Sequence, residues 1–337
     1  MSKWSVAHRL AQMAAVRILD DGGQPTDRRI HIAPLLHAAD LRAVAEPADQ
    51  LFGTYFPPEN GNRGGVWLNS TMSPVDQRHT AAHELGHHTF NHALTCDTDL
   101  ASLSAKPGAM DLTEATAEAF AAWLLMPRAA LLRALTVIGA TPQHLRPEQV
   151  YQVALQLGTS YKGTARHLGV AHIIDGQDAT ALARAVPGKI KNSLDDPTAP
   201  LRAPKADVWD LRRLINADEL TVHHGDRIVL PSIAEQAADT LLCGNAAEFI
   251  HHGITAIVLT ARAAADRADT ARSHRVSLPG SENELVIRVE AGPLARKCPR
   301  AVPNVANLGE AELNQLLAAQ QTGQTVPTTP TEEDACE

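Results

Sequence analysis

Residues 78–92 read RHTAAHELGHHTFNH, and most of what the sequence says about structure and chemistry follows from them. Five of the 16 histidines of the 337-residue chain lie in this stretch, at positions 79, 83, 87, 88 and 92. Just before it, Ser73 can cap a helix and Pro74 suits the first helical position. The sequence therefore predicts a helix that begins at Ser73-Pro74 and carries the histidines.

Within this helix, His83, Glu84 and His87 form the pattern H-E-x-x-H. Residues four apart lie on the same face of a helix, so the imidazoles of His83 and His87 can bind one cation together. Neutral imidazoles suit Zn²⁺, and a catalytic zinc site leaves one coordination position open for water. Glu84 lies one position further round the helix and would face that water. The pattern predicts His83 and His87 as metal ligands and Glu84 as the catalytic base.

A third ligand can be a histidine or a carboxylate. The layout with a third histidine needs Gly at position 90 and His at position 93, but the chain has Phe90 and Ala93. Downstream, Glu114 and Glu118 are four residues apart in EATAEAFAAWLLMP (residues 114–127) and share one helix face. Glu114 is the expected ligand, and Glu118 is expected to accept the second ring N–H of a ligand histidine. Weaker candidates lie in the intervening loop, at Asp97, Asp99 and Asp111.

These two blocks together resemble the ImmA/IrrE family of metallopeptidases, with R-x-T-x-A-H-E-L-G-H followed by E-x-x-A-x-x-F-A-x-x-L-L-M-P. The resemblance covers about residues 5–175. Two positions depart from the family pattern, because His79 replaces an aromatic residue and Glu118 stands where Asn or Asp is common. The resemblance implies a gluzincin-like domain that uses Zn²⁺, or alternatively Mn²⁺, to cleave a helix-turn-helix repressor and so derepress genes in a stress response or a mobile element.

The rest of the chain predicts an α+β protein with a second domain. Residues 1–190 are expected to form a mostly helical, zincin-like metallopeptidase domain with a small sheet. A Pro-rich linker is expected at 191–206, then a β-rich regulatory or docking domain at 207–300. A short helix and a disordered acidic tail are expected at 301–337. Two hairpins are expected in the β-rich domain, one of them turning at His224-Gly225-Asp226.

Residues 147–168 resemble a helix-turn-helix, in which Thr159, Ser160, Lys162 and Arg166 would face DNA. The favoured interpretation is a helix pair that completes the peptidase domain. The formal charge of −8 supports this choice, because phosphate contacts supply much of the affinity for DNA. Direct nucleic-acid binding is therefore not expected.

The N-terminus lacks the unbroken apolar region of a signal peptide, and no apolar stretch approaches the ~20 residues that span a bilayer. A cytoplasmic protein without a membrane partner is expected. The leading hypothesis is a zinc endopeptidase with a protein substrate. The alternative is a non-catalytic regulator that holds a structural metal and binds DNA or a repressor. A structural site would need a fourth protein ligand.

Overall fold

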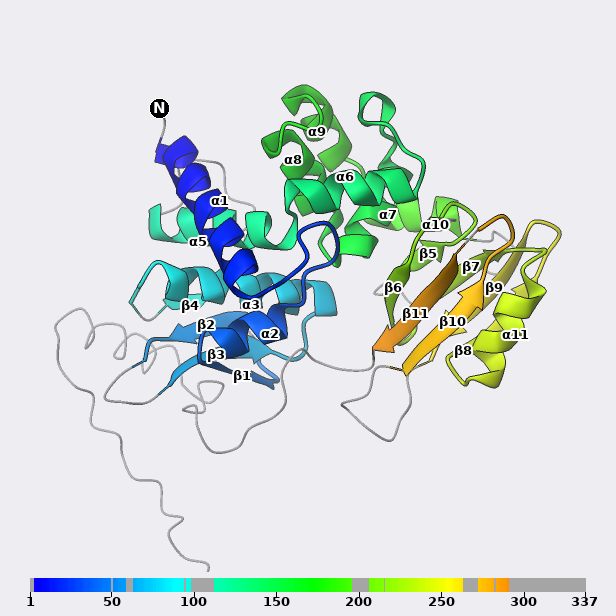
Figure 1. Ribbon diagram of the computed structural model, residues 1–337, viewed down its shortest axis with the longest axis horizontal. Helices are drawn as coiled ribbons and strands as arrows, with labels where there is room; N and C mark the ends of the chain where they lie inside the picture. Colours follow the sequence, from blue (N-terminus) through cyan, green and yellow to red (C-terminus); the bar gives the residue numbers. More distant parts are fainter. Residues whose placement is uncertain are drawn as a thin grey trace, which may run out of the picture.

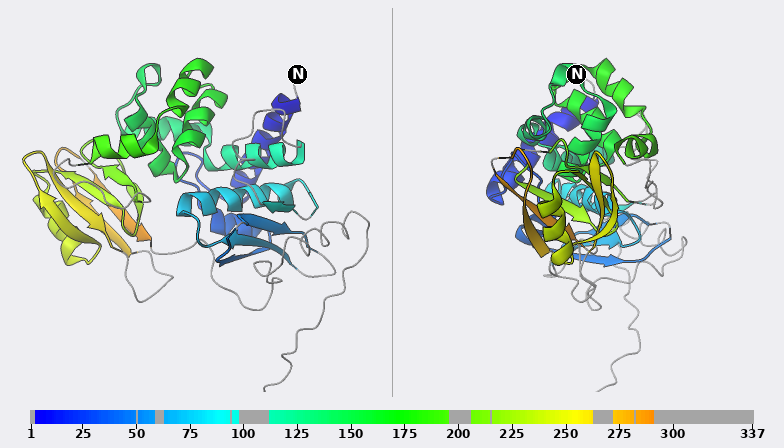
Figure 2. Two further views of the ribbon diagram at one scale, coloured as in Figure 1. Left: turned by 180° about the vertical axis from the view of Figure 1, so that it is seen from behind. Right: turned by 90° about the vertical axis from the view of Figure 1, so that its right-hand side faces the viewer.

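A computed structural model describes residues 3–49, 51–58, 63–93, 95–97, 112–195, 206–214, 216–262, 272–281 and 283–290. These residues form helices and three small sheets, which confirms the predicted α+β class. Figures 1 and 2 show one sheet at one end of the molecule and two sheets at the other, with a group of helices joining them.

The N-terminal sheet has the strand order β1-β3-β2-β4. Its strands are β1 (Leu41–Glu46), β2 (Gly53–Phe56), β3 (Gly64–Asn69) and β4 (Thr95–Asp97). β1 pairs with β3 in parallel, whereas β2 pairs antiparallel with β3 and β4. Every residue of β3 is buried, as expected of a central strand covered on both faces. These strands form the small sheet expected in this part of the chain, and the short helix α2 (Ile32–Ala38) precedes them.

Three helices are layered on this sheet. α3 (Pro74–Thr89) packs on β2 and β3, α5 (Leu112–Leu125) packs on α3, and α1 (Lys3–Asp21) packs on α5. The face of α1 toward α5 carries buried residues spaced four apart, namely Ala7, Ala11, Ala15 and Leu19. Because three of these are alanines, α1 can lie close to α5. This stack places the catalytic helix predicted from the sequence in the centre of the domain.

A group of shorter helices follows. It comprises α6 (Arg128–Val137), the 3₁₀ turn η1 (Pro142–His144), α7 (Pro147–Leu157), α8 (Tyr161–Val170), α9 (Gly176–Ala183) and α10 (Pro187–Leu194). The predicted helix-turn-helix segment is indeed two helices, α7 and α8, joined at Gly158, whose φ of 63° is the left-handed conformation that glycine adopts freely. Of the residues expected to face DNA, Thr159 instead is buried and its hydroxyl hydrogen-bonds to Thr164.

The C-terminal part is β-rich, as expected, and contains two sheets and one unexpected helix, α11 (Glu235–Cys243). The four-stranded sheet has the order β5-β7-β9-β8, and the three-stranded sheet has the order β10-β11-β6. The strands are β5 (Val208–Asp210), β6 (Glu219–His223), β7 (Arg227–Pro231), β8 (Ala247–His252), β9 (Ala256–Ala261), β10 (Arg272–Ser277) and β11 (Glu284–Glu290).

One predicted hairpin is confirmed and the other is wrong. β10 and β11 pair antiparallel as expected. β6 and β7, which flank His224-Gly225-Asp226, belong to different sheets, because β6 pairs in parallel with β11 and β7 pairs with β5 and β9. The turn at Gly225, whose φ is 89°, therefore carries the chain from one sheet to the other.

Buried polar contacts join the β-rich part to α7. The hydroxyl of Tyr151 donates to Asp207 at 2.7 Å. The side-chain amide of Gln152 donates to the carbonyl of Val208 at 2.9 Å and accepts from the N–H of Asp210 at 3.2 Å. α10 extends to Leu194, into the predicted linker, while residues 196–205 and 291–337 lie outside the described part of the chain. The division into domains stays a prediction.

In the described part of the chain, no single helix is both long and apolar enough to cross a membrane. α5 and α6 meet the length and composition criteria only together, and they are bent by 43° relative to each other.

Candidate metal centre

The helix that carries the site begins as the sequence predicts. Ser73 precedes α3 in an extended conformation, and its hydroxyl oxygen accepts the N–H of Asp76 at 3.2 Å. Pro74 occupies the first turn, where its missing N–H costs no helical hydrogen bond. From this start, α3 runs through the protein interior, so that His83, Glu84 and His87 are at most 2% exposed.

The side chains of His83, His87 and Glu114 converge on one point. The ligand atoms of all three lie within 4.8 Å of one another. The two Nε2 atoms of His83 and His87 are 2.9 Å apart, and Glu114 oxygens lie 3.2 Å from the former and 3.6 Å from the latter. Ligands bound to one Zn²⁺ at about 2.0–2.2 Å can be at most about 4.4 Å apart, so these pair distances fit a shared ion.

The donor set also suits zinc chemically. Two imidazoles and a carboxylate form a three-ligand set that is typical of catalytic zinc and leaves a further coordination position open. Burial raises the pKa of Glu114, but hydrogen bonds to His83 and His87 outweigh burial and hold that pKa far below its usual value. Glu114 is therefore a charged carboxylate at neutral pH, as a metal ligand must be.

Glu84 lies on α3 between the two histidines, with its carboxylate against β2. The residue is 1% exposed. A Cβ atom built on Gly53 of β2 would lie 2.8 Å from Oε1 of Glu84, so the strand backbone approaches the carboxylate closely. β2 thus fixes where the predicted base sits.

Glu118 has a different partner from the one expected. Its Oε2 lies 2.8 Å from Nε2 of His79 and 3.6 Å from Nδ1 of His83, a predicted ligand. Only the first distance is that of a hydrogen bond. Glu118 therefore hydrogen-bonds to His79, which lies one helical turn before His83 on α3, and keeps an ion-pair contact with His83; its role beside a ligand histidine stays a prediction.

His92 contacts His87, a predicted metal ligand, in a way that the sequence did not reveal. Its Nδ1 lies 3.0 Å from Nδ1 of His87. When Nε2 of His87 binds a metal, its Nδ1 carries the proton and donates to His92, which fixes the ring orientation. Asn91 after the helix has a φ of 53°, and this left-handed turn brings His92 back toward His87. An Asn at a helix end followed by His is the signal that could have revealed it.

His88 is also more than a surface residue. Its Nδ1 lies 3.0 Å from the hydroxyl of Tyr55 on β2, and the ring is half-buried. Of the weaker ligand candidates, Asp99 and Asp111 lie outside the described residues, as does the side chain of Asp97.

The same segment matches a known peptidase family. Residues 38–158 match peptidase family M78, described as the IrrE N-terminal-like domain. These residues form an IrrE N-terminal-like domain. The match confirms the resemblance to the ImmA/IrrE family, over a shorter span than the expected 5–175. It includes α3 and α5, which carry His83, Glu84, His87 and Glu114. Comparison with curated proteins gives no match.

Proposed function

We propose that this chain is a cytoplasmic zinc-dependent endopeptidase that hydrolyses a peptide bond in a helix-turn-helix repressor and so derepresses genes. The observation that carries the proposal is the convergence of His83, His87 and Glu114 beside the buried carboxylate of Glu84. Among the described residues this group has three members, which supports an open catalytic site over a closed structural one. The family match supports a peptidase.

His83, His87 and Glu114 would hold the ion, with Mn²⁺ as the alternative to Zn²⁺. When bound, the metal supplies Lewis-acid chemistry, polarising a carbonyl and lowering the pKa of water. Glu84 takes a proton from the attacking water on a carboxylate oxygen and delivers it to the leaving amine nitrogen. His92 holds the ring of His87 in place.

The test uses the full chain and a helix-turn-helix repressor encoded beside it, incubated with and without a chelator. We expect metal-dependent scission. Glu84→Gln is expected to keep its metal while cleavage falls by about 10²–10⁴-fold, because only the proton carrier is lost. Glu114→Ala is expected to lose metal affinity. Glu235→Gln, an exposed glutamate on α11, is the matched control.

Two outcomes would contradict the proposal. Undiminished cleavage by Glu84→Gln would exclude Glu84 as the base. A stable, chelator-insensitive complex with the repressor, without scission, would instead support the non-catalytic regulator.

A further inference from the structure

The outer face of helix α1 carries an exposed apolar stripe. Its four members have exposed fractions between 45% and 66%, and they are Val6, Leu10, Met13 and Val16. They recur at intervals of four, three and three residues, which places them on one side of the helix over three turns. The opposite side of α1 is the alanine-rich face that packs on α5, and Figure 1 shows α1 at the surface of the molecule.

The apolar stripe also carries positive charge. Single apolar residues are common on protein surfaces, but a row of them along one side of a helix is the pattern that binds an amphipathic partner. Arg9 and Arg17 lie one helical turn before and one turn after Met13, and residues 3–19 contain no Asp or Glu. Arg17 has Asp21 at 3.5 Å, but both side chains are at least 68% exposed, so this ion pair contributes little. The stripe therefore fits a partner whose apolar face is flanked by carboxylates.

The chain contains such a segment, at residues 307–319, outside the part that the structure describes. Asn307 and Glu310 have the spacing of a helix N-cap and the third helical residue, so the short helix expected within 301–337 should begin here. A leucine face follows at helical spacing, formed by Leu313, Leu316 and Leu317. At 3.6 residues per turn, Glu310 and Glu312 fall on either side of this leucine face.

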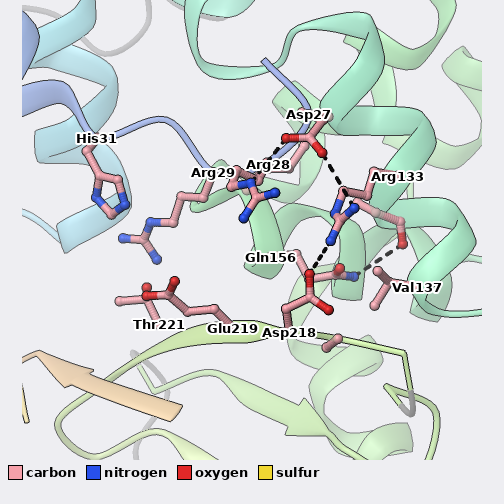
Figure 3. Close-up of a pocket in the computed structure, with 14 residues that line it drawn as sticks. Asp27, Arg28, Arg29, His31, Arg133, Val137, Gln156, Asp218, Glu219 and Thr221 are labelled. Atoms are coloured by element: carbon pink, nitrogen blue, oxygen red, sulfur yellow. Dashed lines mark hydrogen bonds and ion pairs between the residues drawn. The ribbon is translucent and has the colours of Figure 1, made fainter. Parts of the chain in front are cut away.

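The β-rich part is tied to the chain that follows α1. Arg133 bridges Asp27, in the segment between α1 and α2, and Asp218, just before β6, as the dashed lines in Figure 3 show. Nη2 of Arg29 lies 3.7 Å from Oε2 of Glu290, after which the structure describes no further residue. The C-terminal residues therefore leave the described structure beside the segment that follows α1.

Distances along the chain show that residues 307–319 can reach the apolar stripe. The N–H of Gln24 donates to the carbonyl of Leu19 in α1 at 3.0 Å. Arg29 lies five residues beyond Gln24, at most about 18 Å away, and Met13 lies six residues before Leu19, about 9 Å along the helix. With the paired side chains of Arg29 and Glu290 included, the path from Glu290 to Met13 stays below about 50 Å. Residues 291–306 span up to about 53 Å when extended.

We propose that residues 307–319 dock as a helix on the outer face of α1, with the leucine face on the apolar stripe and the two glutamates beside the two arginines. A tether of this length gives an effective concentration of about 1 mM, so a dissociation constant of about 0.1 mM keeps the segment docked about nine-tenths of the time. The docked segment extends the stack of α3, α5 and α1 by one helical layer.

A second copy of the chain fits the apolar stripe less well. Two α1 helices that cross at Met13 would bring Arg9 of one copy beside Arg9 or Arg17 of the other, and like charges at such spacing repel each other. Four side chains also offer much less than the ~800 Å² per partner of a standard stable interface.

Met13 reports the docking directly, because it lies in the middle of the apolar stripe and is 66% exposed without the segment. Its oxidation by hydrogen peroxide is followed by mass spectrometry of the full chain, with the half-buried Met72 as internal reference. We expect Met13 to be oxidised about tenfold more slowly in the unmodified chain than in Leu316→Asp, which places a charge in the leucine face. Ala311→Asp adds the same charge on the opposite side of the expected helix and should keep the protection.

Charge reversal tests the pairing of the two helices. Arg9→Glu with Arg17→Glu is expected to release Met13 for oxidation, and reversing both glutamates of the segment to Arg in the same chain is expected to restore protection. Equal oxidation of Met13 in the unmodified chain and in Leu316→Asp would overturn the proposal. Protection that is unaffected by reversing the arginines would overturn it as well, because the segment would then lie elsewhere. Protection that disappears on dilution, with the mass of two chains in light scattering, would overturn it in favour of a second copy.

Discussion

Nε2 of His79 lies 2.8 Å from Oε2 of Glu118, so the two positions at which this chain departs from the ImmA/IrrE sequence pattern are in contact with each other. Burial alone would lower the pKa of His79, but the Glu118 carboxylate raises it above its usual value. Burial would raise the pKa of Glu118, and His79 holds it far below its usual value instead. His79 and Glu118 therefore form an ion pair. Each of the two departures from the family pattern thus supplies the charge that neutralises the other.

A double-mutant cycle tests this compensation. His79→Phe or Glu118→Gln alone leaves the other charge in a half-buried site, so each single change is expected to cost about 1–3 kcal/mol of unfolding free energy. The double variant is expected to lose less than the sum, with a coupling of about 1 kcal/mol. Urea unfolding measures all four proteins, and strictly additive losses would show that the pair carries no net interaction.

The sequence alone predicted α3, α5 and the grouping of His83, His87 and Glu114, largely because these follow from residue spacing within each helix. The distance from His83 to His87 is set within one helix, and Glu114 is brought to them by the Ala-rich face of α5. The partner of Glu118 could not be read in this way, since it depends on how α5 is rotated over α3. β6 and β7 were paired wrongly for a similar reason. The alternation of apolar and polar residues identifies each of them as a strand. It does not show that β6 pairs with β11, which is distant in sequence, rather than with β7.

Gly53 of β2 should be essential to the position of Glu84. An alanine Cβ there would lie 2.2 Å from Cγ2 of Thr80 and 2.8 Å from Oε1 of Glu84, and both of those residues are buried. We expect Gly53→Ala to cost about 1–3 kcal/mol through overpacking and to reduce repressor cleavage while metal content is retained.

The matched control for this change is Gly65→Ala in the neighbouring strand β3. The nearest atoms to a Cβ at Gly65 are 3.7 and 3.8 Å away, which is ordinary contact. Cleavage and unfolding assays should separate the two variants clearly, and equal effects would mean that the approach of β2 to Glu84 does not matter.

Gly86 allows α3 and α5 to approach closely enough for Glu114 to reach the histidines. A Cβ on Gly86 would lie 3.1 Å from both Cα of Ala117 and Cδ1 of Phe120. Alanine gains about 1 kcal/mol of helix propensity over glycine. The neighbours here are helix backbone and a fully buried ring, so we expect the overpacking to dominate. Gly86→Ala should weaken metal affinity, measured by competition with a chelator.

Gly188 on α10 supplies the comparison, because nothing lies within 4 Å of a Cβ at that position. Gly188→Ala is expected to leave metal affinity unchanged and to be neutral or slightly stabilising. A Gly86→Ala protein that binds metal as tightly as Gly188→Ala would refute the argument from helix spacing.

Arg78 anchors the first half of helix α3 to the protein interior. Its guanidinium donates to the carbonyls of Gly158, Ile30 and Leu157 at 3.1, 2.9 and 3.1 Å. A lysine ammonium is a compact charge that cannot reproduce the planar arrangement of guanidinium N–H donors that reaches these three carbonyls. Arg78→Lys is expected to lower the unfolding free energy by about 2–4 kcal/mol, since buried carbonyls lose their donors. In urea unfolding, a loss no larger than that of the exposed Arg166→Lys would contradict this role.

His167 on α8 should make the fold sensitive to mild acid. Its ring is buried against Trp123, with ring centroids 4.6 Å apart. Burial, with a smaller contribution from His8, lowers the pKa of His167 to about 3, whereas an unfolded histidine titrates near 6.5. Between these values the unfolded chain binds a proton that the folded chain does not. Stability attributable to His167 is therefore full above pH ~6.5 and falls by about 1.4 kcal/mol per pH unit below it.

His167→Leu removes this titration while keeping an apolar contact to Trp123. Over about pH 6 to 4.5, we expect its unfolding free energy to depend less steeply on pH than that of the unmodified chain. The difference in slope corresponds to close to one proton bound on unfolding. The exposed His144→Leu should retain the original slope. Urea unfolding at a series of pH values gives the three slopes. If His167→Leu and the unmodified chain have the same slope, His167 must be protonated in the folded protein, and α8 must then open toward solvent near it.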